Sequence, residues 1–175
     1  LGRGFQLPAH SLRLGLVALG ETCERLLALL PQALELGSSI AVCADCPIPR
    51  LPPEVEIYPL ESLSEILPWA DFLAIDSPRH LLGTLSGWLG KDRALSGQVL
   101  VHTLMPCTGQ AGCGACAVQG RRRPRLVCED GPVFPDERVC RNPGVQEGSA
   151  LLRGAGCRSR GPESGFQRHD GAPAL

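Results

Sequence analysis

The sequence predicts an α/β fold built on a parallel sheet, followed by a small cysteine-rich module and a disordered tail. Three observations lead to this prediction. Short apolar runs alternate with helical patterns over residues 11–103, four cysteines gather within residues 104–138, and residues 139–175 mix Gly, Arg, Ser and Pro without any period. Residues 1–10 precede these parts as a linker segment.

Apolar runs bounded by turn residues predict five strands. They cover Leu12–Leu19, Ile40–Ala44, Val55–Tyr58, Phe72–Ile75 and Gln98–Thr103. Helices are predicted between them, over Glu21–Leu36, around Ser62–Leu67 and over Pro78–Leu89. Pro31 is expected to bend or split the first helix, because proline removes a backbone hydrogen bond. Strands that alternate with helices favour a parallel sheet with right-handed crossovers.

Ligands of parallel sheets bind beyond the carboxyl ends of the strands, which places the expected site at Gly20–Cys23 and Asp76–Pro78. A phosphate-binding loop needs several glycines, so that backbone N–H groups can approach a pyrophosphate. Here the loop reads A-L-G-E-T-C, with Gly20 alone and the negative charge of Glu21 beside it. Gly20 is therefore at most the remnant of a nucleotide loop, which leaves NAD binding doubtful.

The cysteines with the clearest pattern are Cys107, Cys113, Cys116 and Cys128, spaced C-x5-C-x2-C-x11-C on a glycine-rich loop. Closely spaced thiolates, with one more returning from downstream, can enclose a metal centre. A similar C-x4-C-x2-C spacing holds [2Fe-2S] clusters in plant-type ferredoxins. A structural zinc site is the alternative, although zinc ribbons usually pair two C-x2-C units and this loop has one. Both interpretations stay open on spacing alone.

A family resemblance rests on several short motifs. Met105, Cys107, the C-G-A-C of Cys113–Cys116 and the C-E-D-G-P-V-F of Cys128–Phe134 resemble the C-terminal iron–sulfur module of dihydroorotate dehydrogenase electron-transfer subunits. The opening L-G-R-G-F, Leu1–Phe5, is similar to that family's linker between its flavin and nucleotide domains. One departure is that the first cysteine gap holds five residues here and four in the family.

The resemblance implies a [2Fe-2S] cluster on the four cysteines and a ferredoxin-reductase-like nucleotide-binding domain before it. In the family, the cluster relays electrons between FAD and the FMN of a dihydroorotate-oxidising catalytic subunit, with NAD+ as acceptor, in pyrimidine biosynthesis. FAD is expected only in an N-terminal domain that this chain lacks. The chain is therefore expected to be an electron-transfer component that is not catalytic alone. Where the family has C-G-P, this chain has Asp76-Ser77-Pro78, which again weakens the nucleotide site.

Composition limits the class of protein. The net charge of −1 gives no general attraction to nucleic acid or to an anionic membrane, and no apolar run is long enough to span a bilayer. The nine cysteines are odd in number and four fall in a cluster pattern, so a reducing cytoplasm is expected instead of a disulfide framework. The only methionine is Met105, so the chain is expected to be a fragment; Cys140 and Cys157 are expected to be free thiols.

A few residues outside the predicted ligand set have simpler roles. Cys43 and Cys46 form a second C-x2-C pair, but a strand-end cysteine and a loop cysteine explain them more simply. Cys23 is expected to be buried near the first helix. Arg121–Arg123 is expected to be the tip of a hairpin, with a docking patch for an acidic partner as the alternative. Phe134 is expected to plug the space beneath the cluster.

Overall fold

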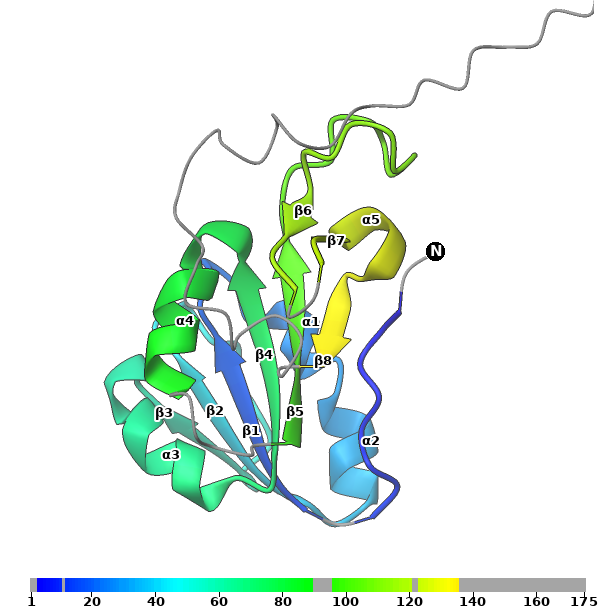
Figure 1. Cartoon of the computed structure of the whole chain (residues 1–175). Helices are drawn as coiled ribbons and strands as arrows, with labels where there is room; N and C mark the ends of the chain where they lie inside the picture. Colours follow the sequence, from blue (N-terminus) through cyan, green and yellow to red (C-terminus); the bar gives the residue numbers. More distant parts are fainter. Residues whose placement is uncertain (1–2, 11, 90–95, 121–122, 136–175) are drawn as a thin grey trace, which may run out of the picture.

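The computed structural model describes residues 3–10, 12–89, 96–120 and 123–135. Within these residues a six-stranded sheet forms the centre of the molecule and carries helices on both faces (Figure 1). The predicted disordered tail, residues 139–175, lies outside the described residues.

The strand order of the sheet is β3-β2-β1-β4-β5-β8. The strands are β1 Arg13–Ala18, β2 Ser39–Ala44, β3 Val55–Tyr58, β4 Phe72–Pro78, β5 Ser96–His102 and β8 Val133–Pro135. The first five run parallel, as predicted, and β8 pairs with β5 in the antiparallel direction. From β1 the chain first adds β2 and β3 on one side, and then returns to add β4 and β5 on the other side. The strand order therefore reverses between β1 and β4. Ligands of such sheets bind at this reversal.

Strand β4 is longer than the sequence pattern predicted. Asp76 and Ser77 are expected after the strand and Pro78 at the start of the next helix, yet all three continue the register of β4 against Leu100–His102 of β5. All three are buried. The prediction ended the strand at the last apolar residue, whereas backbone pairing with a longer neighbour continues it through two polar residues.

The helices are short and cover both faces of the sheet. They are α1 Glu24–Leu27, α2 Leu30–Glu35, α3 Leu63–Trp69 and α4 Leu82–Leu89, with 3₁₀ turns η1 Leu60–Ser62 and η2 Arg79–Leu81. Pro31 lies in the first turn of α2, so the predicted first helix is indeed split there. Helices α1 and α2 lie on one face and α3 and α4 on the other (Figure 1). Among the described residues, no helix combines the length and apolar character that crossing a bilayer requires.

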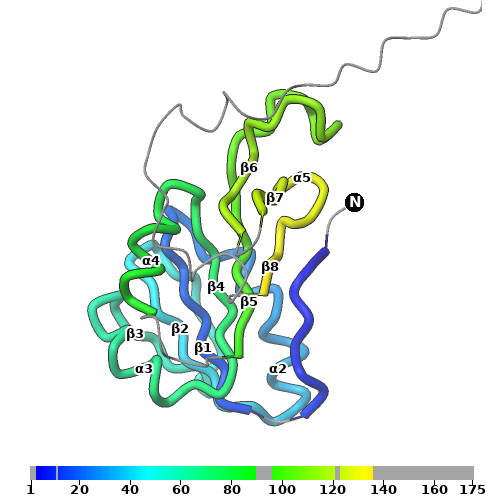
Figure 2. Tube along the Cα trace, viewed as in Figure 1, coloured from blue at the N-terminus to red at the C-terminus, as the bar shows by residue number. Residues whose placement is uncertain are grey.

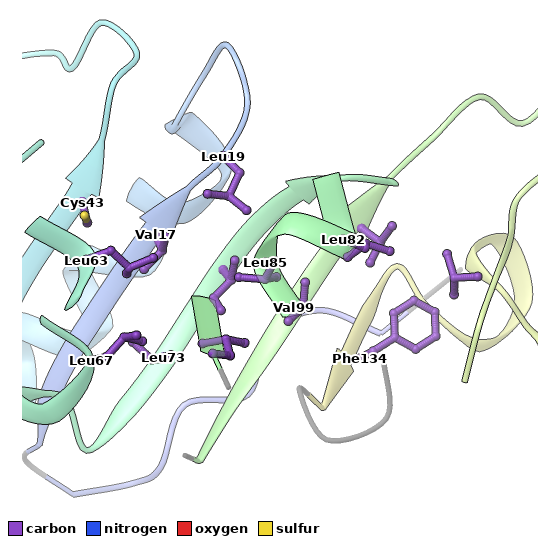
Figure 3. Packing of buried hydrophobic residues seen from close by; sticks show 14 of the residues in the cluster. Val17, Leu19, Cys43, Leu63, Leu67, Leu73, Leu82, Leu85, Val99 and Phe134 are labelled. Carbon is purple, nitrogen blue, oxygen red and sulfur yellow. The ribbon is translucent and has the colours of Figure 1, made fainter. Parts of the chain in front are cut away.

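Two hydrophobic clusters result from the alternation of side chains along the strands. Val17 of β1 and Leu73 of β4 pack beneath α3 and α4, together with Leu85 of α4 (Figure 3). The intervening residues, such as Leu16 and Ala74, pack against the α1 and α2 side. Both clusters consist of residues that are almost fully buried, as expected for strands of a parallel sheet covered on both faces.

The segment before β1 lies against the segment that leads into β8 (Figure 2). The backbone N–H of Arg3 donates to the carbonyl of Gly131 at 3.0 Å, and the N–H of Val133 donates to the carbonyl of Arg3 at 3.3 Å. On the other side, the N–H of Val101 in β5 donates to the carbonyl of Pro132 at 2.9 Å. Arg3 of the L-G-R-G-F motif is therefore a neighbour of the distant D-G-P-V-F motif.

Gly97 of β5 tests the close packing of the sheet. A Cβ at this position would lie 2.8 Å from the carbonyl oxygen of Leu73 and 3.2 Å from its Cβ, so Gly97→Ala forces the two strands apart. We expect this change to lower the free energy of unfolding by roughly 1–3 kcal/mol in urea denaturation. Gly87→Ala is the matched control, because a Cβ there meets nothing within 4 Å.

The control change should leave stability unchanged or raise it by up to about 1 kcal/mol, since alanine favours helix α4 more than glycine does. Equal unfolding free energies for Gly97→Ala and the original chain would contradict the described packing of β5 on β4.

Candidate functional site

The four predicted ligand cysteines lie beyond the carboxyl edge of the sheet, on and after the loop that follows β5 (Figure 1). We call residues 103–116 the cysteine loop; it carries Cys107 and Cys113 and ends at Cys116. Cys128 lies in α5, Val127–Asp130. The short strands β6, Ala117–Val118, and β7, Arg125–Leu126, pair in the antiparallel direction and return the chain to the loop. Of the predicted hairpin tip, Arg121 and Arg122 lie outside the described residues. The sulfur atoms of Cys116 and Cys128 are consequently 3.3 Å apart.

Cys107 lies beside Cys113 on the loop. The hydrogen bond with the Cys113 side chain is the main reason that the pKa of Cys107 falls to about 6. Backbone N–H groups of Cys113, Gly109 and Gln110 add to this lowering. The N–H of Ala115 is in turn 3.4 Å from the sulfur of Cys113. The loop therefore directs several backbone donors at sulfur, an arrangement that favours thiolates.

The backbone of the cysteine loop adopts conformations that side chains rarely allow. Gly109 and Gly114 have φ of 84° and 67°, a region that glycine adopts without steric cost. Thr108 and Ala111 also have positive φ, of 52° and 56°. For a β-branched residue such as Thr108 this region is costly. Backbone strain of this kind gathers at ligand-holding segments. These turns close the loop tightly enough that a Cβ on Gly109 would lie 4.0 Å from the Cβ of Cys128.

The two thiol pairs influence each other. The contact with Cys116 is the first cause, and burial the second, of the raised pKa of Cys128; the negative charge of Cys107 also contributes. The four cysteines thus lie near one another as two pairs. In the described part of the chain, no three or more Cys, His, Asp or Glu side chains are already grouped as metal ligands. The four-cysteine ligand set remains a prediction.

A hydrophobic floor lies beneath the pairs. Cys116 is 1% exposed and belongs to the same buried cluster as Val127 and Phe134. Gly131 explains part of this packing, because a Cβ there would lie 2.6 Å from the Phe134 ring and 3.1 Å from the carbonyl oxygen of Val127. Phe134 is therefore buried in the same cluster as Cys116, and its position requires the glycine of D-G-P-V-F.

Asp130 closes the turn that carries Cys128. Its carboxylate accepts a hydrogen bond from Arg125 at 2.6 Å and from the backbone N–H of Leu126 at 3.0 Å. Burial raises the pKa of Asp130, but these donors outweigh burial and the pKa is lowered overall. The aspartate of the motif therefore has a structural role, which is to hold α5 against β7.

A second polar group occupies the expected nucleotide site. Asp76 of β4 is fully buried at the point where the strand order reverses. One carboxylate oxygen accepts a hydrogen bond from Arg25 of α1 at 3.1 Å. The other lies 3.5 Å from Nε2 of His102, and neither of these two atoms makes a hydrogen bond among the described residues. Sequence reasoning missed Arg25 and His102, because their partner is distant in sequence.

This arrangement weakens the site for a dinucleotide. The pyrophosphate of a dinucleotide binds at the carboxyl edge and carries negative charge, as Asp76 already does. Gly20, the one glycine of the predicted loop, faces His102: a Cβ on Gly20 would lie 3.4 Å from Nε2 of His102. Gly20 and His102 are therefore neighbours at this edge.

The remaining described cysteines do not form the second C-x2-C site. Cys43 donates to the carbonyl of Pro59 at 3.2 Å on one face of the sheet. Cys46 packs with Cys23 on the opposite face. Burial raises the pKa of both Cys23 and Cys43 to about 11. Both thiols are fully buried, which agrees with their interpretation as core residues.

His102 makes stability depend on pH. Burial, with Arg25 and His80 contributing, lowers its pKa in the folded protein, although Asp76 acts in the opposite direction. Below about pH 6.5 the unfolded chain therefore takes up a proton more readily than the folded one, and stability falls as pH decreases. We expect His102→Gln to lose less unfolding free energy between pH 7 and pH 5 than the original chain in urea titrations. An equal or larger loss in the variant would contradict this assignment.

NADH provides a direct test of the carboxyl edge. Because Asp76 is buried there and Glu21 is exposed beside it, we expect no saturable change when NADH is titrated against the purified chain and its fluorescence is followed. Saturable binding would show that the edge accepts a pyrophosphate despite both carboxylates, and would restore the nucleotide site.

Comparison with known proteins shows a shared fold. The sequence matches no family model and no curated protein. Among solved structures, an NADH-dependent reduced ferredoxin-NADP oxidoreductase, described for its insights into flavin-based electron bifurcation, is similar with a TM-score of 0.60 and 16% identity. The likeness covers 79% of this chain and 57% of that chain, so this chain spans less than two thirds of its length. The likeness therefore confirms the predicted ferredoxin-reductase-like α/β fold.

Proposed function

We propose that this chain is an electron-transfer protein whose Cys107, Cys113, Cys116 and Cys128 hold a [2Fe-2S] cluster. One observation carries the proposal: Cys116 and Cys128 are in contact, and Cys107 and Cys113 lie beside each other on a strained loop that directs an N–H group at sulfur. Amide-to-sulfur hydrogen bonds and four thiolates are the chemistry that such clusters require. The four thiols and the N–H donors therefore fit the cluster. The two pairs of cysteines would have to come together into one ligand set when the cluster binds.

Each part of the loop has a role in this proposal. The thiolates bind, and the N–H groups of the loop stabilise their negative charge. Phe134 and Val127 exclude water from below, while the exposed Cys113 and Met105 leave the opposite side open to a partner. When bound, the cluster supplies a carrier that accepts and releases one electron.

We further propose a flavin-containing redox partner. The shared fold with a ferredoxin-NADP oxidoreductase studied for flavin-based electron bifurcation supports a flavin-linked role. The motif resemblance narrows the proposal to an FMN-containing catalytic subunit that oxidises dihydroorotate to orotate in pyrimidine biosynthesis, with FAD in a separate domain. That oxidation releases two electrons and two protons, and a one-electron carrier would pass the electrons singly between the flavins. The chain by itself would have no catalytic activity.

Elemental analysis and spectroscopy test the cluster. We expect anaerobically purified protein to contain about two irons and two sulfides per chain, to be red-brown, and to give a rhombic EPR signal only after reduction. Zinc without sulfide or colour would contradict the proposal and assign the cysteines to a structural zinc site.

The same experiment on variants tests the ligand set. Cys113→Ser and Cys116→Ser should each lose most of the iron and sulfide, because each removes one of four ligands. Cys157→Ser, a matched change outside the described residues, should keep the full content. Equal cluster content in all three variants would show that other residues hold the metal.

A further inference from the structure

Arg79 joins the α/β part of the chain to the cysteine loop. It follows β4 directly, as the first residue of η2. Its guanidinium nitrogen Nη1 donates to the carbonyl oxygen of Ala115 at 2.6 Å, across 36 residues of sequence. The side chain is half-buried, so this short bond is partly shielded from water. Bonds from a charged donor are among the stronger hydrogen bonds in proteins.

Ala115 occupies a sensitive position. It separates Cys113 from Cys116 by way of the C-G-A-C turn, and its own N–H points at the sulfur of Cys113. Its carbonyl belongs to the peptide bond that begins Cys116. Arg79 therefore binds the carbonyl of Ala115, while the N–H of the same residue contacts Cys113, a predicted ligand. A shift of this peptide would move both Cys113 and Cys116.

Among the described residues, Arg79 differs from several other arginines in having no carboxylate partner. Arg13, Arg25 and Arg125 each form an ion pair with an aspartate. Within the part of the chain that the structure describes, no carboxylate lies within the 4.0 Å ion-pair distance of Arg79. Arg79 places its positive charge within hydrogen-bond distance of the peptide that joins Ala115 to Cys116.

We propose that Arg79 is a positioning residue that fixes the Cys113–Cys116 turn and raises the reduction potential of the group bound there. The first part stands on the hydrogen bond to Ala115 alone. The second part rests on the proposed function, since reduction adds a negative charge that a nearby cation favours. Neither part requires Arg79 to contact the metal.

Three variants test the proposal. Arg79→Gln removes the charge and shortens the side chain, Arg79→Lys keeps a charged donor, and Arg50→Gln removes an exposed arginine elsewhere as the matched control. Circular dichroism first establishes that each variant is folded. Backbone hydrogen exchange of residues 113–118 is then followed by mass spectrometry in metal-free protein, with β1 as the internal reference.

We expect exchange of residues 113–118 to be at least about threefold faster in Arg79→Gln. In this variant the turn can open without first breaking the hydrogen bond between Arg79 and Ala115. Arg79→Lys and Arg50→Gln should resemble the original chain, and exchange of β1 should be unchanged in all. In cluster-loaded protein, the midpoint potential of Arg79→Gln should fall, by on the order of a three- to tenfold change in the reduction equilibrium, or about 30–60 mV.

The two measurements separate this inference from the proposed function. Absence of iron and sulfide from the original chain would refute the proposed function, and hydrogen exchange would then decide the positioning role by itself. Unchanged exchange in Arg79→Gln would overturn the positioning role, and an unchanged potential in loaded protein would overturn the electrostatic one. A fall in potential that Arg79→Lys does not rescue would also count against the role of the charge.

Discussion

The antiparallel pairing of β8 with β5 is the constraint on which the rest of the structure depends. β5 leads into the cysteine loop, and β8 follows directly after α5, so one pair of strands holds both ends of the cysteine-rich segment. The register places Val99 opposite Phe134 and Leu100 opposite Val133. This pairing inserts Phe134 into the core beneath α4, and the Phe134 ring in turn requires glycine at position 131. The cysteine-rich segment is therefore an extension of the sheet.

A loop anchored at both ends can hold backbone conformations that a free loop would relax. Thr108 and Ala111 keep positive φ values, which for residues with a side chain cost on the order of 1–2 kcal/mol each. The N–H···S contacts, the Arg79 bond to Ala115 and the pairing of β5 with β8 offset this cost. The result is a loop whose backbone donors are held near the cysteine sulfur atoms in the folded chain.

The carboxyl edge of the sheet is occupied by the chain's own polar side chains. Folds of this class use the reversal of strand order between β1 and β4 for a ligand. In this chain Asp76 fills that position, and a buried carboxylate needs a counter-charge to be tolerated. Arg25 supplies this charge, and His102 lies close to the second oxygen. The polar side chains at this edge thus interact with one another. In the cysteine loop beyond the edge, the N–H of Ala115 contacts the sulfur of Cys113.

The sequence by itself determined the parallel α/β fold and the split helix at Pro31, because apolar periodicity and proline are local properties of a chain. It did not predict β8, since three residues that pair with a distant strand have no periodic signal. Nor did it predict the extension of β4 through Asp76.

Only the tertiary structure decided which side chains meet. Arg79 with Ala115, Asp76 with Arg25 and the pairing of Cys116 with Cys128 join residues that are 36, 51 and 12 positions apart. Such contacts depend on the order of strands in the sheet and on how each loop crosses its edge. No local pattern records that order, because it results from packing two hydrophobic faces at once.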